Sequence, residues 1–225
     1  MSVTVTIAEN APVTIPARAT ASLASFREWA GNNDLPEKAK LLYYRGEVAV
    51  EMGKEQLYTH VEVKTEIVTV LRVLARKERL GRMWAEGPLV TNETADVSNN
   101  PDAVFVSNET FTSGQVTAVE GKEGGFVELV GSPDMVLEVV SDSSEKKDNQ
   151  TLFEAYYEAG IAEYWLVDAR GTEIEFHIYK RGAKKYAVTK KLPGGWTKSA
   201  AFGKSFRLVR GKDATGNPEF TLEVK

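Results

Sequence analysis

Apolar residues recur at helical spacing in two segments of the chain. In residues 59–81 an apolar stripe repeats every three or four positions, and basic residues and then Gly81 follow it. Residues 148–159 carry a second stripe and end before Gly160. This spacing places apolar side chains on one helix face, and a glycine often follows the last turn. The pattern predicts two amphipathic helices, the first of them ending at Gly81.

Shorter apolar runs predict strands around these helices. Residues 87–92 and 102–107 are β-prone, residues 134–141 are apolar except for one internal carboxylate, and residues 163–168 follow the second helix. A nearly unbroken apolar strand is typical of a central position that is covered on both faces. The order helix, strand, strand, strand, helix, strand predicts an α/β fold with a sheet between helices.

Further β-prone segments flank and interrupt this core. Residues 40–53 are typical of a hairpin that turns at Arg45 and Gly46. Residues 107–131 are typical of an inserted hairpin that turns near residues 122–125. Glycine favours such turns because it adopts backbone conformations that other residues avoid.

The chain length is sufficient for one medium-sized domain with additions. Of its 225 residues, 42% are hydrophobic. We expect residues 1–40 to form an extended arm and a short helix around residues 26–30. We expect residues 41–180 to form the core and residues 181–225 a β-rich extension of the same domain.

Composition narrows the chemistry that this chain can perform. It has no cysteine and two histidines, which excludes disulfides, thiolate metal sites and a multi-histidine zinc site. The net charge of -4 argues against a protein that coats nucleic acid, although a local basic groove remains open. No apolar stretch approaches the ~20 residues of a membrane span, and no secretion signal is recognisable. We therefore expect a cytoplasmic location and no membrane partner.

One charge lies inside the predicted central strand. Glu138 shares a strand face with Val136 and Val140, while Leu137 and Val139 point to the other face. A buried ionised carboxylate is costly unless a cation or hydrogen-bond donors meet it. Glu138 is therefore either part of a structural ion pair, or a carboxylate at the rim of the sheet, or a metal ligand; residue type alone leaves these alternatives open.

If Glu138 binds a metal ion, a second carboxylate is expected to share the ion, and Asp134 and Asp102 are the two candidates. Asp134 is on the same strand but about 13 Å away, at ~3.3 Å per residue. Asp102 begins a different predicted strand, and the two carboxylates converge if that strand neighbours the strand of Glu138. Carboxylate oxygens suit Mg²⁺ or Mn²⁺, with water and a substrate phosphate completing the shell. Such a site fits phosphodiester hydrolysis.

The blocks "PDAVFVS", "SPDMVLEVVSDSS" and "GIAEYWLVDAR" resemble a known family. They are similar to the bacterial putative restriction endonuclease domain family, long labelled as of unknown function, within the PD-(D/E)XK nuclease-like superfamily. The resemblance covers roughly residues 41–179. It implies an αβββαβ core, a mixed central sheet flanked by helices, with extra strands at both termini. It also implies a Mg²⁺-dependent DNA endonuclease in which Asp102 is the motif aspartate and Glu138 the strand carboxylate, both of them metal ligands.

The lysine that the superfamily uses to assist the attacking water is missing from its two expected positions. Val140 stands two residues after Glu138, and Leu152 stands at the alternative position in the second helix. Lys146 and Lys147, just ahead of that helix, are the remaining candidates because a side chain there could turn back toward the carboxylates, and Lys147 is the preferred one. By default, a lysine in this position belongs to a solvated patch.

The first helix offers further candidate groups, because related nucleases often add a helical glutamate to the metal site. His60, Glu62 and Glu66 are available. Each of the three is nevertheless expected to face solvent or to cap the helix. Tyr156 is expected in the core.

Two other interpretations remain open. With the lysine lost, the fold could serve as a catalytically impaired module that binds nucleic acid or protein. Alternatively, Glu138 could simply pair with Lys147. A homodimer is expected only from function, because cutting both strands of DNA requires two sites.

Overall fold

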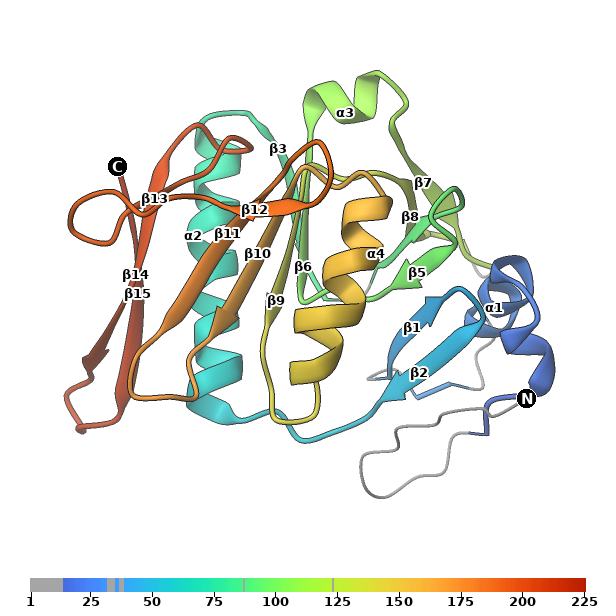
Figure 1. Ribbon diagram of the computed structural model, residues 1–225, viewed down its shortest axis with the longest axis horizontal. Helices are drawn as coiled ribbons and strands as arrows, with labels where there is room; N and C mark the ends of the chain where they lie inside the picture. Colours follow the sequence, from blue (N-terminus) through green and yellow to red (C-terminus); the bar gives the residue numbers. More distant parts are fainter. Residues whose placement is uncertain (1–13, 32–34, 37–38, 87, 123) are drawn as a thin grey trace.

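The computed structural model describes residues 14–31, 35–36, 39–86, 88–122 and 124–225, which form three β-sheets with helices packed on and between them (Figure 1). The helical elements are η1 (Ala17–Thr20), α1 (Leu23–Ala30), η2 (Leu57–Glu62), α2 (Val63–Lys77), α3 (Asn108–Thr112), η3 (Lys147–Thr151) and α4 (Leu152–Glu158). The strands are β1 (Lys40–Tyr44), β2 (Glu47–Glu51), β3 (Gly81–Ala85), β4 (Leu89–Asn92), β5 (Val97–Asn99), β6 (Ala103–Ser107), β7 (Val116–Glu120), β8 (Phe126–Gly131), β9 (Met135–Val139), β10 (Glu163–Asp168), β11 (Glu175–Arg181), β12 (Tyr186–Val188), β13 (Thr197–Lys198), β14 (Ser205–Lys212) and β15 (Pro218–Val224).

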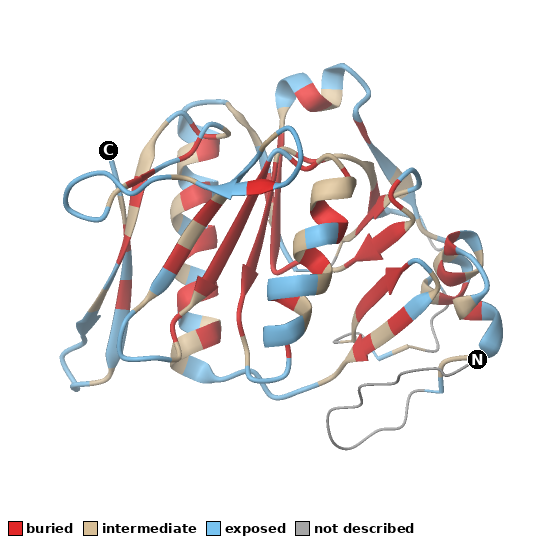
Figure 2. Cartoon of the chain, viewed as in Figure 1, coloured by how far each residue is buried: buried red, intermediate tan, exposed pale blue. Residues whose placement is uncertain are grey.

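The central sheet has the order β12-β11-β10-β9-β6-β3. Strands β9 and β10 run parallel, and the other neighbours are antiparallel. A mixed sheet flanked by helices confirms the predicted fold class. Strand β9 lies inside this sheet and is buried along its whole length, as its apolar sequence predicted (Figure 2).

The two faces of β9 enter two separate hydrophobic cores. Met135, Leu137 and Val139 pack toward α2 and the third sheet, β13-β14-β15. Val136 and Val140 pack toward α4 and the second sheet, whose order is β2-β1-β5-β4-β8-β7. The layers follow one another across the molecule in Figure 1, from the C-terminal sheet through α2, the central sheet and α4 to the second sheet and α1. Period-two alternation of side chains is what allows one strand to serve both cores.

Helix α2 ends earlier than its sequence indicated. Its last residue is Lys77, and Arg79 then adopts a left-handed backbone with φ of 55°. Gly81 does not end the helix but begins β3, where a side chain would collide with the backbone of Val106. The glycine is explained by the close approach of β6, so the predicted helix end was wrong.

Several other elements agree with the sequence pattern and some were missed. The hairpin of β1 and β2 and the inserted hairpin of β7 and β8 are present as predicted. The short elements β3, β5 and α3 were not predicted, and neither was the separation of the strands into three sheets. The extended arm falls largely on residues 1–13, which lie outside the described residues.

No described helix is long and apolar enough to cross a membrane. The division into arm, core and extension stays a prediction.

Candidate active site

The two predicted carboxylates meet at one end of the central sheet. Strand β6 pairs with β9, with Ala103 opposite Leu137, so Asp102 lies beside Glu138 in the continued register. Both side chains line a cavity of about 450 Å³, together with Lys147. The condition set by the sequence, that the two strands be neighbours, is therefore met.

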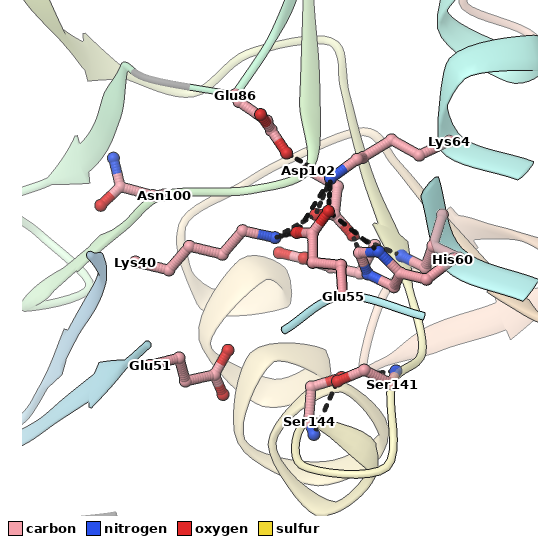
Figure 3. Close-up of polar contacts among 12 residues, drawn as sticks. Lys40, Glu51, Glu55, His60, Lys64, Glu86, Asn100, Asp102, Ser141 and Ser144 are labelled. Atoms are coloured by element: carbon pink, nitrogen blue, oxygen red, sulfur yellow. Dashed lines mark hydrogen bonds and ion pairs between the residues drawn. The ribbon is translucent and has the colours of Figure 1, made fainter. Parts of the chain in front are cut away.

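Asp102 is almost completely buried and is held by several donors (Figure 3). Its Oδ1 accepts a hydrogen bond from Lys40 Nζ at 2.6 Å, and its Oδ2 accepts one from the backbone nitrogen of Val139 at 2.8 Å. His60 Nε2 lies 3.6 Å from Oδ2 and Lys64 Nζ lies 3.8 Å from Oδ1. Burial opposes ionisation, but the contact with His60 and the charges of the two lysines hold the pKa of Asp102 below its usual range.

His60 belongs to this cluster, contrary to the expectation that it faces solvent or caps the helix. It lies in η2, a wide helical turn ahead of α2, and it is buried. Its Nδ1 is 3.5 Å from Glu55 Oε2. Burial alone would lower the pKa of His60, but the carboxylates of Asp102 and Glu55 outweigh it and raise the pKa to about 9. The ring therefore points into the site and not toward solvent.

Glu138 has different surroundings from those of Asp102. Its Oε1 accepts hydrogen bonds from Tyr156 Oη at 2.6 Å and from Asn99 Nδ2 at 3.2 Å. Burial, and then the negative charges of Asp148 and Asp102, raise the pKa of Glu138 to about 8. A cation bound beside this carboxyl group would favour its ionised form.

Lys147 points into the same cavity but does not pair with Glu138. Its Nζ donates to Glu51 Oε2 at 2.8 Å and lies 3.6 Å from Asp148 Oδ1. Its positive charge nevertheless acts to lower the pKa of Glu138. The simple Glu138–Lys147 ion pair, one of the open interpretations, is not formed.

The other positions considered from the sequence lie away from the cavity. Val140 and Leu152 are buried in the apolar core between the central sheet and α4. Glu66 accepts a hydrogen bond from the backbone nitrogen of Leu222 and so faces the C-terminal sheet. Glu62 is not among the residues that line the cavity. Neither glutamate of the first helix joins the site.

One group of side chains has the composition of a metal site. Glu55, His60 and Asp102 each offer a ligand atom, and these atoms lie within 4.8 Å of one another. Two buried polar atoms of residues that line the cavity, His60 Nδ1 and Asp148 Oδ1, have no hydrogen-bond partner among the described residues, although each faces an oppositely charged group, at 3.5 Å and 3.6 Å. Carboxylates with an imidazole suit Mn²⁺ or Mg²⁺, and a bound ion would displace the proton that the raised pKa keeps on His60. The residues therefore fit a divalent cation.

Sequence reasoning missed several members of this site. For two of them a signal existed: Lys64 precedes Ile67 by three and Leu71 by seven residues, and His60 precedes Ile67 by seven. Both therefore fall on the apolar face of the helix pattern, where a polar side chain needs a reason. Lys40 and Glu55 had no such signal, because β1 and the segment before η2 reach the cavity only through tertiary packing.

A mixed sheet flanked by helices, with acidic residues at matching ends of two neighbouring strands, defines a restriction-endonuclease-like fold. The chain belongs to the Uma2 family, described as putative restriction endonuclease, whose family model matches residues 23–209. It is also similar to a solved structure described as a putative nuclease belonging to DUF820 from Anabaena variabilis, with a TM-score of 0.57 and 16% sequence identity. That similarity covers 81% of this chain and 90% of the other, and at this identity it shows the fold alone. No curated protein matches the chain.

Proposed function

We propose that this protein is a Mg²⁺-dependent DNA endonuclease that hydrolyses phosphodiester bonds, with Asp102 and Glu138 as metal ligands. The proposal rests mainly on one observation, the convergence of these carboxylates from neighbouring strands on one cavity. Membership of a putative restriction endonuclease family supports it. When bound, the metal would lower the pKa of a water molecule and neutralise charge on the scissile phosphate.

The side chains around Asp102 would complete the site. Glu55 and His60 are placed to share the cation with Asp102, because their ligand atoms lie within 4.8 Å. Lys40 now occupies part of this space, since its Nζ is 2.6 Å from Asp102 and 3.1 Å from Glu55. A cation that enters would move this ammonium group away from the carboxylates and toward the phosphate.

Lys147 would take the role of the missing superfamily lysine. It is largely buried, and the charges of Asp148, Glu138 and Glu51 outweigh the effect of burial and raise its pKa, so it stays protonated. An ammonium group beside the scissile phosphate would stabilise the negative charge that builds up during hydrolysis or position the water.

The decisive experiment compares Glu138→Gln with Glu163→Gln. Glu163 is an equally buried glutamate in the next strand, β10, and it does not line the cavity. Supercoiled plasmid is incubated with each protein and Mg²⁺ or Mn²⁺, and nicking is followed on gels. We expect Glu138→Gln to lose nicking by at least a thousandfold and the folded fraction of Glu163→Gln to keep it. Nicking by Glu138→Gln at the wild-type rate would refute the assignment.

The alternative function is a catalytically impaired module that binds nucleic acid or protein. The burial of Val140 and Leu152 in the apolar core, at both expected lysine positions, favours it. Calorimetric titration with Mn²⁺ followed by the plasmid assay separates the two, because the module would bind DNA without metal-dependent cleavage. Cutting both strands would need two copies of the chain, which sedimentation analysis with and without DNA would detect.

A further inference from the structure

The charges of this acidic protein are distributed very unevenly along the chain. The whole chain has 28 Lys and Arg against 32 Asp and Glu. Residues 176–212 contain eleven of these basic residues and not one acidic residue. A polyanion that approaches the protein would therefore meet attraction on one part of it and repulsion on the rest.

The first part of this stretch forms an edge of the central sheet. Strand β12 is the outermost strand and is joined to β11 by a hairpin (Figure 1). The last two residues of β11 and the last two residues of β12 are exposed, whereas Tyr186, which begins β12, is buried (Figure 2). Six exposed basic residues lie in this hairpin and just after β12, and we name them the basic edge: Lys180, Arg181, Lys184, Lys185, Lys190 and Lys191.

Three of the five basic residues that follow the basic edge within residues 176–212 are held by other groups, and within the edge Arg181 donates to the backbone carbonyl of Tyr157. Lys204 pairs with Glu78 at 2.9 Å, Arg207 pairs with Glu223, and Arg210 donates to backbone carbonyls. These side chains serve the packing of the C-terminal sheet. Within the described part of the chain, no member of the basic edge has an acidic partner within the 4.0 Å of an ion pair. Unpaired exposed lysines are free to neutralise phosphates.

The register of the sheet connects the basic edge to the cavity. Glu138 lies opposite Leu166 in β10, and Leu166 lies opposite His177 in β11. Thr189 continues the ladder by donating to the backbone carbonyl of Ile178, which brings Lys190 alongside His177. Three strand spacings of ~4.8 Å place the backbone of Lys190 about 14 Å from that of Glu138.

The surface between these two points is hollowed. A second cavity of about 500 Å³ is lined by His177 and Tyr179 of β11, and it shares Asp142 and Ser143 with the first cavity. Its lining also has four carboxylates, and Arg170 pairs with three of them, those of Asp142, Glu145 and Asp168. Lys190 lies opposite His177, which lines this second cavity, and Lys191 follows it in the chain. The second cavity therefore lies between the basic edge and the cavity of Glu138, and the two cavities adjoin at Asp142 and Ser143.

We propose that the basic edge binds the phosphate backbone of a nucleic acid strand, and that a phosphate of the same strand, a few nucleotides away, lies in the cavity of Asp102 and Glu138. The proposal rests on the proposed nuclease function for the identity of the ligand. A separation of about 14 Å corresponds to roughly four base pairs at 3.4 Å each, so a short stretch of backbone reaches both places. The acidic remainder of the surface would keep the same strand from binding elsewhere.

The test uses two triple variants that change the net charge equally. The first is Lys184→Gln, Lys190→Gln and Lys191→Gln, all on the basic edge. The matched control is Arg72→Gln, Arg76→Gln and Lys77→Gln, three exposed residues of α2. Binding of a fluorescein-labelled DNA duplex is measured by anisotropy in EDTA, so that no cleavage occurs, at several salt concentrations. Thermal melts establish that both variants fold.

We expect the basic-edge variant to bind at least tenfold more weakly, with the slope of log K against log salt reduced by about one per lysine that contacts phosphate. The control should bind within twofold of the wild type. Equal losses in both variants, or none in the first, would overturn the proposal. Equal or tighter binding of polyglutamate by the wild type would also overturn it, because the surface would then suit an acidic protein.

Failure of the nuclease assignment would look different. If Glu138→Gln still nicks plasmid while the basic-edge variant loses affinity for DNA, the catalytic assignment falls and the binding surface stands. If Glu138→Gln is inactive and the basic-edge variant keeps full affinity for DNA, the catalytic assignment stands and the proposed binding surface is wrong.

Discussion

Two buried glutamates in neighbouring strands show how differently one side chain can be used. Glu163 begins β10, and both of its oxygens are fully engaged: Ser199 Oγ donates at 2.6 Å, Trp165 Nε1 donates at 3.1 Å, and the backbone nitrogens of Ala200 and Ala201 donate to the other oxygen. It ties the central sheet to the segment that leads into the C-terminal sheet. All of its partners are neutral donors of the protein itself.

Glu138, one strand away, is only partly satisfied. Its hydrogen bonds from Tyr156 and Asn99 both reach Oε1, and within the described residues none reaches Oε2. Its neighbours Asp102 and Asp148 add negative charge. A buried carboxylate with a full set of donors stabilises a fold, whereas one that is left partly unpaired beside a cavity is available to a ligand.

The largest effect that tests this comparison is a loss of stability. Glu163→Gln replaces an acceptor oxygen with an amide nitrogen, which faces donors and cannot accept from them. We expect the free energy of unfolding in urea to fall by roughly 2–4 kcal/mol, because hydrogen bonds to a charged group are worth about 1.5–3 kcal/mol each. Glu138→Gln should cost far less. Equal losses for the two variants would mean that both glutamates are structural.

A second test asks which lysine, Lys147 or Lys40, assists cleavage on the Glu138 side of the cavity. Lys147→Met should lower the cleavage rate about a hundredfold, because it removes the positive charge that acts on Glu138. Lys40→Met should act mainly on stability, since Lys40 compensates the buried charge of Asp102. Single-turnover cleavage and urea unfolding of both variants separate the two roles. If Lys40→Met loses more of the cleavage rate than Lys147→Met does, the catalytic lysine is Lys40 of β1 and not Lys147.

The pH dependence of stability gives a third test, made without divalent cations. The pKa of Glu138 is raised in the folded protein from an ordinary 4.5 to about 8. A raised pKa stabilises the fold fully below the unfolded value, and this contribution is lost as the pH rises through the folded value. Glu138→Gln resembles the protonated form at every pH.

The melting temperature of Glu138→Gln in EDTA should therefore match that of the wild type near pH 5 and exceed it by a few degrees at pH 9. Added Mn²⁺ should reverse the order, because only the wild type gains a ligand. A constant difference across the pH range would show that Glu138 is ionised without help.

The sequence predicted the strands that form this site better than the side chains that complete it. The apolar run around Glu138 specified a central strand, and period-two alternation correctly assigned its faces. Asp102 was identified at the start of another predicted strand, but the local pattern did not decide whether that strand neighbours the strand of Glu138. Local patterns of this kind follow from backbone geometry and burial, which are encoded over a few residues.

The remaining site residues depend on contacts between distant segments. Lys40 and Glu55 lie more than 80 positions before Glu138, and nothing in their local sequence specifies the meeting point. His60 was misjudged because its position at the start of the helix suggested capping or exposure, although its spacing of seven residues from Ile67 places it on the apolar face. It lies in the wide turn η2. Wide turns of this type are frequent at functional sites.

The smallest predicted effect is the loss of stability when the short hydrogen bond from Tyr156 to Glu138 is removed. Tyr156 Oη donates to Glu138 at 2.6 Å and accepts from Asn99 at 2.6 Å. Tyr156→Phe should lower the free energy of unfolding by about 1 kcal/mol. Tyr164→Phe is the matched control, since its equally buried hydroxyl donates to the backbone carbonyl of Asp148 and not to Glu138.

The two tyrosine variants should lose similar stability but differ in metal binding. A donor that holds a ligating carboxylate fixes its orientation, and losing such a partner typically weakens metal binding by about tenfold or more. Titration calorimetry with Mn²⁺ should show weaker binding in Tyr156→Phe and unchanged binding in Tyr164→Phe. Unchanged binding in both would mean that Glu138 does not contact the ion, so that any metal is held on the Asp102 side alone by Glu55, His60 and Asp102.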